Sequence, residues 1–412
     1  MEAFYLEWAN LLLRWLHVIT AMAWIGASFY FVFLDSSLEK PQEPNPDRVA
    51  GELWAIHGGG FYHARKFMAA PPRVGGFLHW FYIESYFTWI SGFLLFSVSY
   101  LWSPTAYLID PSVADLSSGQ AIAAALGLLL GFLVVYELIC RYAGAPGKGD
   151  KAVAFFVASA VAAGAWLSTE LFSGPAAFLI TGAMIATVMS ANVLLWIIPG
   201  QRKMVASLQA GETVDPTPGL IGKQRSVHNT YFTLPVLLAM LSNHYSFLTS
   251  SDQRLLFLLG LMLAGALIRY YFVRMHGYKL GRHGHPWAFG LAGLAIVGCL
   301  IGYSAVAELE KRQLAQSAAT SLSVPALPLG ASGPQGQGIA PIQRVMAQHC
   351  LQCHGAQVQM KNIRLDSLAS IEQHASAVYQ QVVVLRAMPL NNATQFTEAE
   401  RNLVKTWYET RQ

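Results

Sequence analysis

Eight stretches of the chain are long and apolar enough to cross a membrane. A transmembrane helix needs about 20 predominantly apolar residues. The pattern predicts such helices over residues 11–34, 78–101, 121–140, 152–171, 176–198, 231–248, 255–273 and 287–306. We therefore expect an all-α fold, built on a polytopic membrane bundle of about eight transmembrane helices.

The pattern changes after the last of these stretches. Residues 311–338 are rich in Ala, Ser, Pro, Gly and Gln, a composition typical of a flexible linker. Residues 339–412 resume a helical pattern, and Thr397 with Glu400 forms a capping box before the last helix. The predicted organisation is a membrane domain over 1–310, the linker, and a small C-terminal domain.

Composition agrees with a membrane protein. Hydrophobic residues make up 54% of the chain and charged residues 12%, against about 25% charged in soluble proteins. The net charge of +4 is too small and dispersed to indicate nucleic-acid binding. The N-terminus, Met1–Phe4, has no early Lys or Arg, so we expect the first apolar stretch to remain as a span rather than a cleaved signal.

Basic residues concentrate in alternate loops, which predicts the orientation. The second, fourth and sixth loops are almost free of Lys and Arg. The odd-numbered loops carry Lys40, Arg48, Arg65, Lys66, Arg73, Arg141, Lys148, Lys151, Arg202, Lys203, Lys223, Arg225, Arg274, Lys279 and Arg282. The positive-inside rule places these loops in the cytoplasm. With an even number of spans, both termini lie in the periplasm of a bacterial inner membrane.

The strongest chemical motif is Cys350-Leu351-Gln352-Cys353-His354. Two thiols separated by two residues and followed by histidine are the attachment signature of a covalent c-type haem. The alternatives are a redox Cys-x-x-Cys pair or half of a zinc site. A zinc site needs a second ligand pair, and the other cysteines, Cys140 and Cys299, lie in apolar runs. We predict one haem c, on the periplasmic side where such attachment takes place.

A methionine completes the predicted iron coordination. Met388 precedes Pro389 in a turn before the last helix, where a small cytochrome places its sixth ligand. Met346 and Met360 are competitors, but the first fits helix packing and the second lies close to the haem motif. Coordination by His354 and Met388 would raise the potential and suit an acceptor that passes electrons onward.

Two histidines near the periplasmic side are candidate ligands for a second haem. His17 lies in the first predicted helix and His244 closes the sixth. Ionisable groups in membrane spans are functional candidates. These two would form either a bis-imidazole site for haem b or a pair of interfacial histidines bonded to the backbone.

A second group of histidines falls on the predicted cytoplasmic side. His57 and His63 flank the glycine run 58–60, and His228 with Asn229 precedes the sixth span. The glycine run either lets backbone approach a flat ligand or forms a flexible re-entrant turn.

The whole chain resembles the bacterial membrane-bound urate oxidases (urate hydroxylases), which combine an N-terminal eight-helix domain with a C-terminal cytochrome c domain. The resemblance rests on the haem motif after a linker and on residues 15–18, 23–26, 57–63, 227–231 and 242–244. The first helix is also similar to that of small membrane protoporphyrinogen oxidases, which are associated with haem b. That similarity favours a haem at His17.

This resemblance implies oxidation of urate to 5-hydroxyisourate in purine breakdown. It implies that electrons pass to the fused cytochrome rather than directly to oxygen, and onward to a soluble cytochrome or terminal oxidase of the respiratory chain. Haem ligation carries over to Cys350, Cys353, His354 and Met388.

Our hypothesis for the catalytic residues is inferred from chemistry. Urate is a planar anion that needs cationic or amide donors and a base. We predict that His57, His63, His228 and Asn229 bind urate, with help from Arg65 or Arg73, and that His17 and His244 carry electrons across the membrane. Alternatives are a periplasmic urate site, a non-enzymatic respiratory subunit that passes electrons from a quinol or partner, and a transporter with a redox gate.

Overall fold

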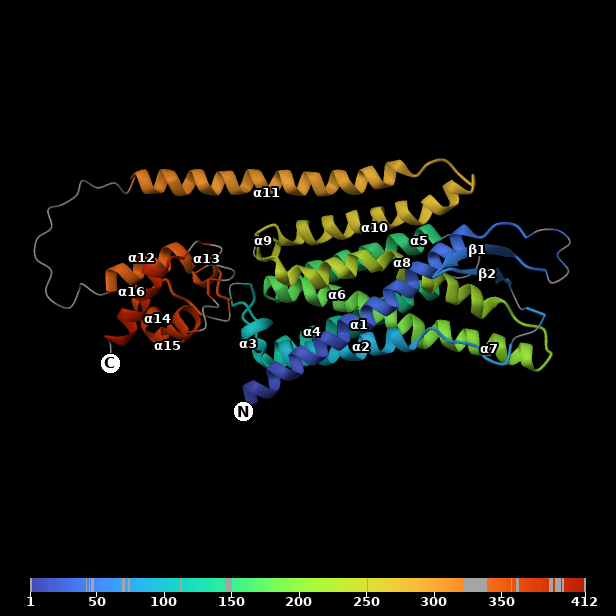
Figure 1. The fold of residues 1–412 in the computed structure, drawn as a ribbon, viewed down its shortest axis with the longest axis horizontal. Coiled ribbons are helices and arrows are strands. Elements are labelled where there is room, and N and C mark those ends of the chain that lie inside the picture. Colours follow the sequence, from blue (N-terminus) through green and yellow to red (C-terminus); the bar gives the residue numbers. More distant parts are fainter. Residues whose placement is uncertain are drawn as a thin grey trace, which may run out of the picture. The chain divides into compact units, whose positions relative to one another are not determined.

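The computed structural model is mostly helical and divides into two compact units, Met1–Glu308 and Leu309–Gln412 (Figure 1). The residues it describes are 2–41, 43, 45, 48–68, 71–72, 75–111, 113–144, 150–249, 251–321, 339–356, 358–360, 363–384, 388–389, 394 and 396–410.

The first unit is a bundle of long helices with one small sheet. In chain order its elements are α1 (Glu2–Ser37), β1 (Gly51–His57), β2 (Gly60–Lys66), α2 (Ile83–Phe96), η1 (Ser97–Leu101), α3 (Pro104–Tyr107), α4 (Ser118–Tyr142), α5 (Asp150–Leu171), α6 (Gly174–Ala191), η2 (Asn192–Ile197), α7 (Ile198–Gln209), α8 (Thr217–Leu241), η3 (Ser242–His244), α9 (Ser246–Thr249), α10 (Arg254–Lys279) and α11 (Trp287–Ser321).

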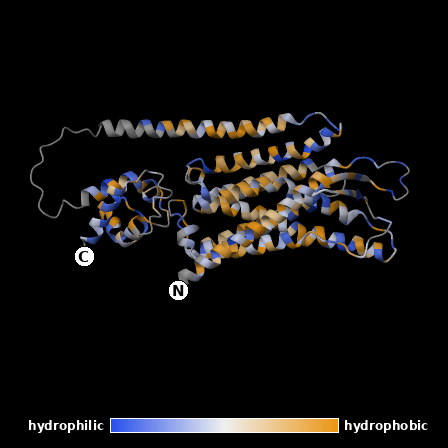
Figure 2. Ribbon diagram, in the orientation of Figure 1, coloured by the Kyte–Doolittle hydropathy of each residue, from blue (hydrophilic) through white to orange (hydrophobic). Residues whose placement is uncertain are grey.

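Six helices in the described part of the chain are long and apolar enough to cross a membrane. They are Trp8–Ser37, Ser118–Tyr142, Lys151–Leu171, Gly174–Gln209, Arg254–Lys279 and Trp287–Ala307. Figure 2 shows apolar residues along these helices and polar residues at the ends of the bundle. Each of the six coincides with one of the eight predicted spans, and outward-facing leucines and aromatics are typical of a surface that meets lipid.

The other two predicted spans are helical but differ from expectation. The stretch 78–101 becomes α2, of 14 residues, which continues into the π-helical segment η1. The stretch 231–248 begins in α8 and continues through η3 into α9. α8 begins already at Thr217 and carries Lys223, Arg225 and His228 in its first half. Packing against neighbouring helices stabilises this polar half as helix, which the apolar pattern could not predict.

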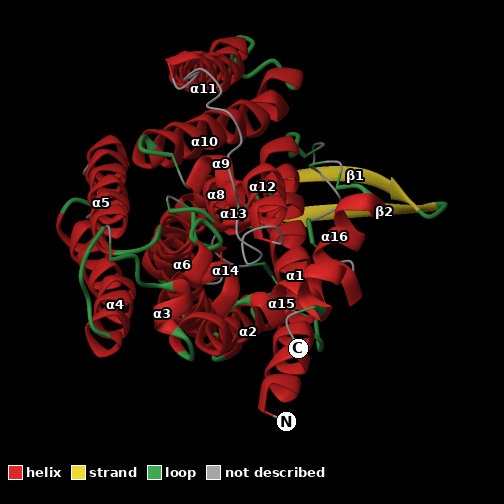
Figure 3. Ribbon diagram, turned by 90° about the vertical axis from the view of Figure 1, so that its left-hand side faces the viewer, coloured by secondary structure: helices red, strands yellow, loops and turns green. Residues whose placement is uncertain are grey.

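A β-hairpin corrects the all-α expectation. Strands β1 and β2 pair antiparallel, with His57 opposite Gly60 and Trp54 opposite His63. Gly58 and Gly59 form the two-residue turn with φ of 58° and 80°. Such a turn needs positive φ at both positions, which glycine adopts without steric cost. The glycine run is therefore a hairpin turn, and Figure 3 shows the strands extending sideways from the helices.

The core of the first unit centres on α6, which is buried on nearly all sides. Its Gly, Ala, Ser and Thr residues are small, so neighbouring helices approach closely, as small residues allow in membrane bundles. α4, α5 and α8 pack around it (Figure 3). The result holds α4, η2 and α8 side by side, which positions the polar site described below.

The basic loops gather at one end of this unit. Figure 1 shows the β-hairpin, the α7–α8 connection and the α10–α11 connection at the end opposite the N-terminus and α9. This arrangement agrees with the predicted alternation of basic and non-basic loops. α11 then runs back along the bundle, so the chain leaves this unit at the end that holds the N-terminus.

The second unit is a small helical domain. Its elements are α12 (Ile339–His349), α13 (Leu351–His354), α14 (Leu368–Gln373), α15 (Ala375–Tyr379), η5 (Gln380–Val384) and α16 (Glu398–Glu409). α12, α15 and η5 pack with α16 around a core that contains Ile342, Met346 and Trp407. The capping box at Thr397 and Glu400 is present. α11 continues to Ser321, into the predicted linker, and 322–338 lies outside the described residues.

Candidate functional site

A buried polar network joins α4, η2 and α8 in the middle of the first unit. The phenol oxygen of Tyr136 lies 2.7 Å from Nδ1 of His228. Asn192 donates from Nδ2 to that phenol oxygen at 3.0 Å and to Oδ1 of Asn229 at 2.9 Å. Tyr136 and Asn192 are fully buried. In such surroundings a polar group needs a partner, and this network supplies one to Tyr136 and to the Asn192 amide.

An ion pair extends the network toward the bundle surface. Arg225 makes a bidentate contact with Glu137 at 3.0 and 2.9 Å, and Trp196 donates to the same carboxylate at 3.0 Å. The guanidinium also lies 5.0 Å from the ring centroids of Tyr136 and Trp196. Arg225 is only 3% exposed, so the pair ties α4 to α8 in a region of low dielectric.

A π-helical segment presents two members of this network. η2 interrupts the continuous helix formed by α6 and α7, just before Pro199. Proline has no N–H for the helical ladder, so the hydrogen bonding shifts ahead of it. The extra residue in this turn places Asn192 and Trp196 on the side that faces α4 and α8.

Both the oxygen and the nitrogen of the Asn229 amide form hydrogen bonds within the protein. Its Oδ1 accepts from Asn192, and its Nδ2 donates to the backbone carbonyl of Met189 at 3.0 Å. His228 is half-buried, and its Nδ1 also lies 3.9 Å from Sγ of Cys140. The arrangement makes His228 the group able to exchange a proton, and Asn229 a residue that positions Asn192.

The four residues predicted to share the urate site do not gather in one place. His228 and Asn229 belong to the network inside the bundle, whereas His57 and His63 lie on the β-hairpin. His63 bonds through Nε2 to Glu52 at 3.0 Å and stacks on Trp54 at 4.1 Å. His57 is exposed at the end of β1.

Of the two arginines proposed as helpers, only Arg65 lies within the described residues. Arg65 lies 6.0 Å from the Phe67 ring centroid, on the hairpin strand β2. Arg73 lies outside the described residues.

His17 packs between α1 and α2. Its Nδ1 lies 3.0 Å from the carbonyl oxygen of Thr88 and 3.2 Å from the hydroxyl of Ser91. A Cβ on Gly92 would lie 2.7 Å from Cε1 of the ring, so only glycine lets the imidazole approach this closely. A proton on Nδ1, donated to the carbonyl, leaves Nε2 with a lone pair.

His244 lies elsewhere, exposed in the short turn η3 at the end of α8. Within the described residues no hydrogen bond or ring contact joins His17 to His244. The structure therefore does not bring these two predicted ligands into contact.

The Cys350–His354 segment forms a single helical turn. Cys350 is the N-cap of α13 and Cys353 lies within the helix, and both are free thiols. Nδ1 of His354 lies 3.1 Å from the carbonyl oxygen of Ile363. That hydrogen bond orients the ring and is of the kind that metal-bound histidines make through the nitrogen that does not bind the metal. Burial raises the pKa of Cys350 to about 12, so it is a neutral thiol.

The three candidate methionines occupy different environments. Met346 is 1% exposed in the core, as helix packing predicts, and Met360 is 46% exposed. Met388 is half-buried and packs against the same core cluster as Cys350. Met388 is therefore the methionine whose surroundings suit a ligand beside the thiols.

Sequence reasoning missed four members of the buried network: Tyr136, Glu137, Asn192 and Arg225. A signal was present, because Glu137 and Asn192 lie within predicted membrane spans, where polar side chains are costly. Arg225 was assigned to orientation alone. Its partner on α4 is 88 positions away in the sequence, and only the fold reveals it.

Comparisons with known proteins bear on the first unit. No curated protein and no solved structure matches the chain. A family model described as urate oxidase N-terminal matches residues 3–302, which is nearly all of this unit and more than half of the chain. The protein therefore belongs to the urate oxidase N-terminal family.

Proposed function

We propose that the protein is a membrane-bound oxidoreductase that converts urate to 5-hydroxyisourate and passes the electrons to a haem c in its C-terminal unit. In the balanced reaction, urate and water give 5-hydroxyisourate, two protons and two electrons. The observation that carries the proposal is the urate oxidase family match over residues 3–302 in a chain that ends in Cys350-x-x-Cys353-His354.

The buried network supplies the proton chemistry in this proposal. Oxidation of urate releases protons, and a histidine in contact with a phenol can take one up. His228 is the base, and Tyr136 with Asn192 fixes its ring. His57 and His63 stay predicted site residues; turnover by His57→Ala and His63→Ala tests the hairpin separately from the bundle.

The residues of the C-terminal unit fit a covalent haem. Cys350 and Cys353 would attach the haem through thioether bonds, and His354 and Met388 would coordinate its iron. The group would supply one-electron acceptance, so each urate would require two transfers. The carbonyl oxygen of Ile363 orients the His354 ring.

Electrons must reach that haem from the membrane unit. We propose that eight helices cross a bacterial inner membrane, with both termini in the periplasm and the basic loops in the cytoplasm. His17 fits one ligand of a haem b, because its Nδ1 is held by Thr88, and His244 is the proposed second ligand. Electrons then leave for a soluble cytochrome or a terminal oxidase.

Haem reduction by substrate tests the function. Urate added to anaerobic membranes that contain the protein is expected to reduce the c-type haem, as seen in its absorption spectrum. A Cys350→Ala, Cys353→Ala variant should show no such change. If a quinol reduces the haem and urate does not, the protein is a respiratory electron-transfer subunit instead. A pyridine haemochrome assay that reports only haem c would remove the haem b proposal.

A further inference from the structure

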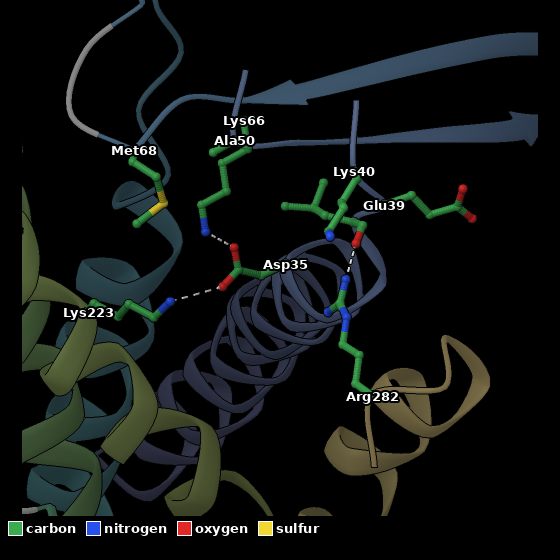
Figure 4. Close-up of a pocket in the computed structure, with 9 residues that line it drawn as sticks. Asp35, Glu39, Lys40, Ala50, Lys66, Met68, Lys223 and Arg282 are labelled. Carbon is green, nitrogen blue, oxygen red and sulfur yellow. Dashed lines mark hydrogen bonds and ion pairs between the residues drawn. The ribbon is translucent and has the colours of Figure 1, made fainter. Parts of the chain in front are cut away.

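The end of the first unit that carries the basic loops contains an open pocket of about 230 Å³. Asp35, at the end of α1, lies at its centre, and Lys66 from β2 and Lys223 from α8 both pair with that carboxylate (Figure 4). Arg282, in the turn after α10, lines the pocket as well. Segments far apart in the sequence therefore converge on one cavity.

The pocket has an excess of positive charge. Lys40, Lys66, Lys223 and Arg282 face two carboxylates, those of Asp35 and Glu39. Figure 4 shows the Glu39 carboxylate directed away from Asp35 and from the two lysines that pair with Asp35. Two ammonium groups thus share one carboxylate, so this group of three side chains keeps a net positive charge that can attract an anion.

Arg282 makes different contacts from Lys66 and Lys223. Arg282 donates from Nη1 to the carbonyl oxygen of Ser36 at 3.1 Å, and also to the carbonyl oxygen of Leu38. It caps the last turn of α1, where free carbonyls concentrate negative partial charge. The two ammonium groups that pair with the central carboxylate are Lys66 and Lys223.

The charged form of Lys66 is disfavoured in this pocket, and a bound anion would favour it. Burial and the nearby Lys223 ammonium lower the pKa of Lys66 from its ordinary value. Both effects disfavour its charged form, and an added negative charge in the pocket would offset both.

The α1–α10 seam continues from this pocket into the bundle. The rings of Phe33 and His276 are 5.3 Å apart, and deeper along the seam Arg269 lies 3.7 Å from the Phe29 ring centroid. Arg269 is 6% exposed, and among the described residues its Nε and Nη2 have no hydrogen-bond partner. A buried cation with unpaired donors is costly, so an anion that reached this part of the seam would be stabilised.

We propose that this pocket captures urate as its anion, with Lys66 and Lys223 pairing with the negatively charged edge of the purine. The inference rests on the proposed function and adds the place and the residues of substrate recognition. The pocket lies on the face of the basic loops, so urate enters from the side opposite the end at which the chain leaves the first unit.

Binding is measured apart from turnover, on full-length protein reduced with dithionite in nanodiscs of zwitterionic lipid, by equilibrium dialysis of urate. Reduced protein cannot oxidise its ligand, so the dissociation constant is read directly. Lys66→Gln should weaken binding about tenfold or more, because a hydrogen bond to a charged group is lost. Lys223→Gln, in a more exposed position, should weaken it several-fold.

Lys203→Gln is the matched control. It removes the same charge from an exposed site on α7 that does not line the pocket, so binding should not change. A loss of affinity in the Lys66 and Lys223 variants but not in Lys203→Gln therefore assigns capture to the pocket.

The outcomes distinguish the two proposals. If urate reduces the haem but the Lys66 and Lys223 variants bind it as tightly as the wild type, the pocket is not the capture site and the proposed function stands. If the wild type neither binds urate nor is reduced by it, both proposals fail. If Lys66→Gln and Lys223→Gln change the urate dissociation constant only in nanodiscs with anionic lipid, the pocket holds a lipid headgroup and the capture proposal is overturned.

Discussion

Tyr136 and His228 face each other across the contact between α4 and α8, with 2.7 Å between the phenol oxygen and Nδ1. The two residues are 92 positions apart. The apolar pattern predicts the helix of Tyr136 only as a membrane span, and it does not predict the part of α8 that carries His228. Their contact is the centre of the polar network that we assign to proton transfer.

Replacement of His228 should stop catalysis and leave the haem intact. His228→Ala is expected to lower kcat for urate by about 10²–10⁴, the usual contribution of a general base. The c-haem spectrum should be unchanged, because His228 belongs to the other unit. Tyr136→Phe keeps the imidazole but removes its partner, so a smaller loss of kcat is expected. Normal turnover by His228→Ala would exclude this network from the chemistry.

The Arg225–Glu137 pair should contribute to stability more than to chemistry. Arg225→Met leaves the Glu137 carboxylate with no cation and only the Trp196 N–H as donor, and breaking a buried pair costs about 3–5 kcal/mol. The double variant with Glu137→Gln should recover part of this loss, since no charge is then left unpaired. Thermal unfolding of the detergent-solubilised protein measures both, with Lys203→Gln as an exposed control. Equal losses in the single and double variants would contradict the pairing.

The methionine ligand can be identified by comparing two substitutions. Met388→Ala should abolish methionine coordination of the oxidised haem and lower its reduction potential, because histidine–methionine ligation raises the potential. Met360→Ala should change neither, since Met360 is 46% exposed. Redox titration of both variants decides the matter. A lowered potential in the Met360 variant alone would reassign the ligand.

Acid should weaken the C-terminal unit in a defined range. Glu400 accepts hydrogen bonds from the backbone N–H and hydroxyl of Thr397, and pairs with His349 at 3.0 Å. Hydrogen bonds from Thr397, then His349, lower the pKa of Glu400 from 4.5 to about 2. A carboxyl with a lowered pKa stabilises the fold above its ordinary pKa, and this contribution is lost as the pH falls toward the lowered value.

Glu400→Gln tests this directly. Its melting temperature, followed by haem absorbance, should lie below the wild type at neutral pH. The difference should hold down to about pH 4.5 and shrink between there and about pH 2. A difference that grows on acidification would have the wrong sign for this mechanism.

The sequence predicted the parts of this molecule that depend on local pattern. Hydrophobic runs located six helices that are long and apolar enough to cross a membrane, and the spacing of Thr397 and Glu400 located the last helix cap. The alternation of basic loops agrees with their common position at one end of the bundle. These features depend on neighbours along the chain, so a single sequence is enough.

The remaining features depend on contacts between distant segments. Apolar pattern could not predict that the polar first half of α8 is helical, because α6, η2 and α10 stabilise it from outside. The hairpin was missed, since Gly58 and Gly59 were interpreted as a ligand-binding or flexible run. Lys66 and Lys223 were interpreted only as orientation charges and Asp35 was not singled out, because these residues form a site only where α1, β2 and α8 meet.

The central claim is tested most directly by anaerobic titration of the purified, oxidised protein with urate, read as the fraction of haem c reduced. Each urate supplies two electrons. With haem c alone, half an equivalent of urate per protein should complete the reduction; with an additional haem b, one equivalent is needed. A haem c that stays oxidised in excess urate, yet is reduced by dithionite, would contradict the account.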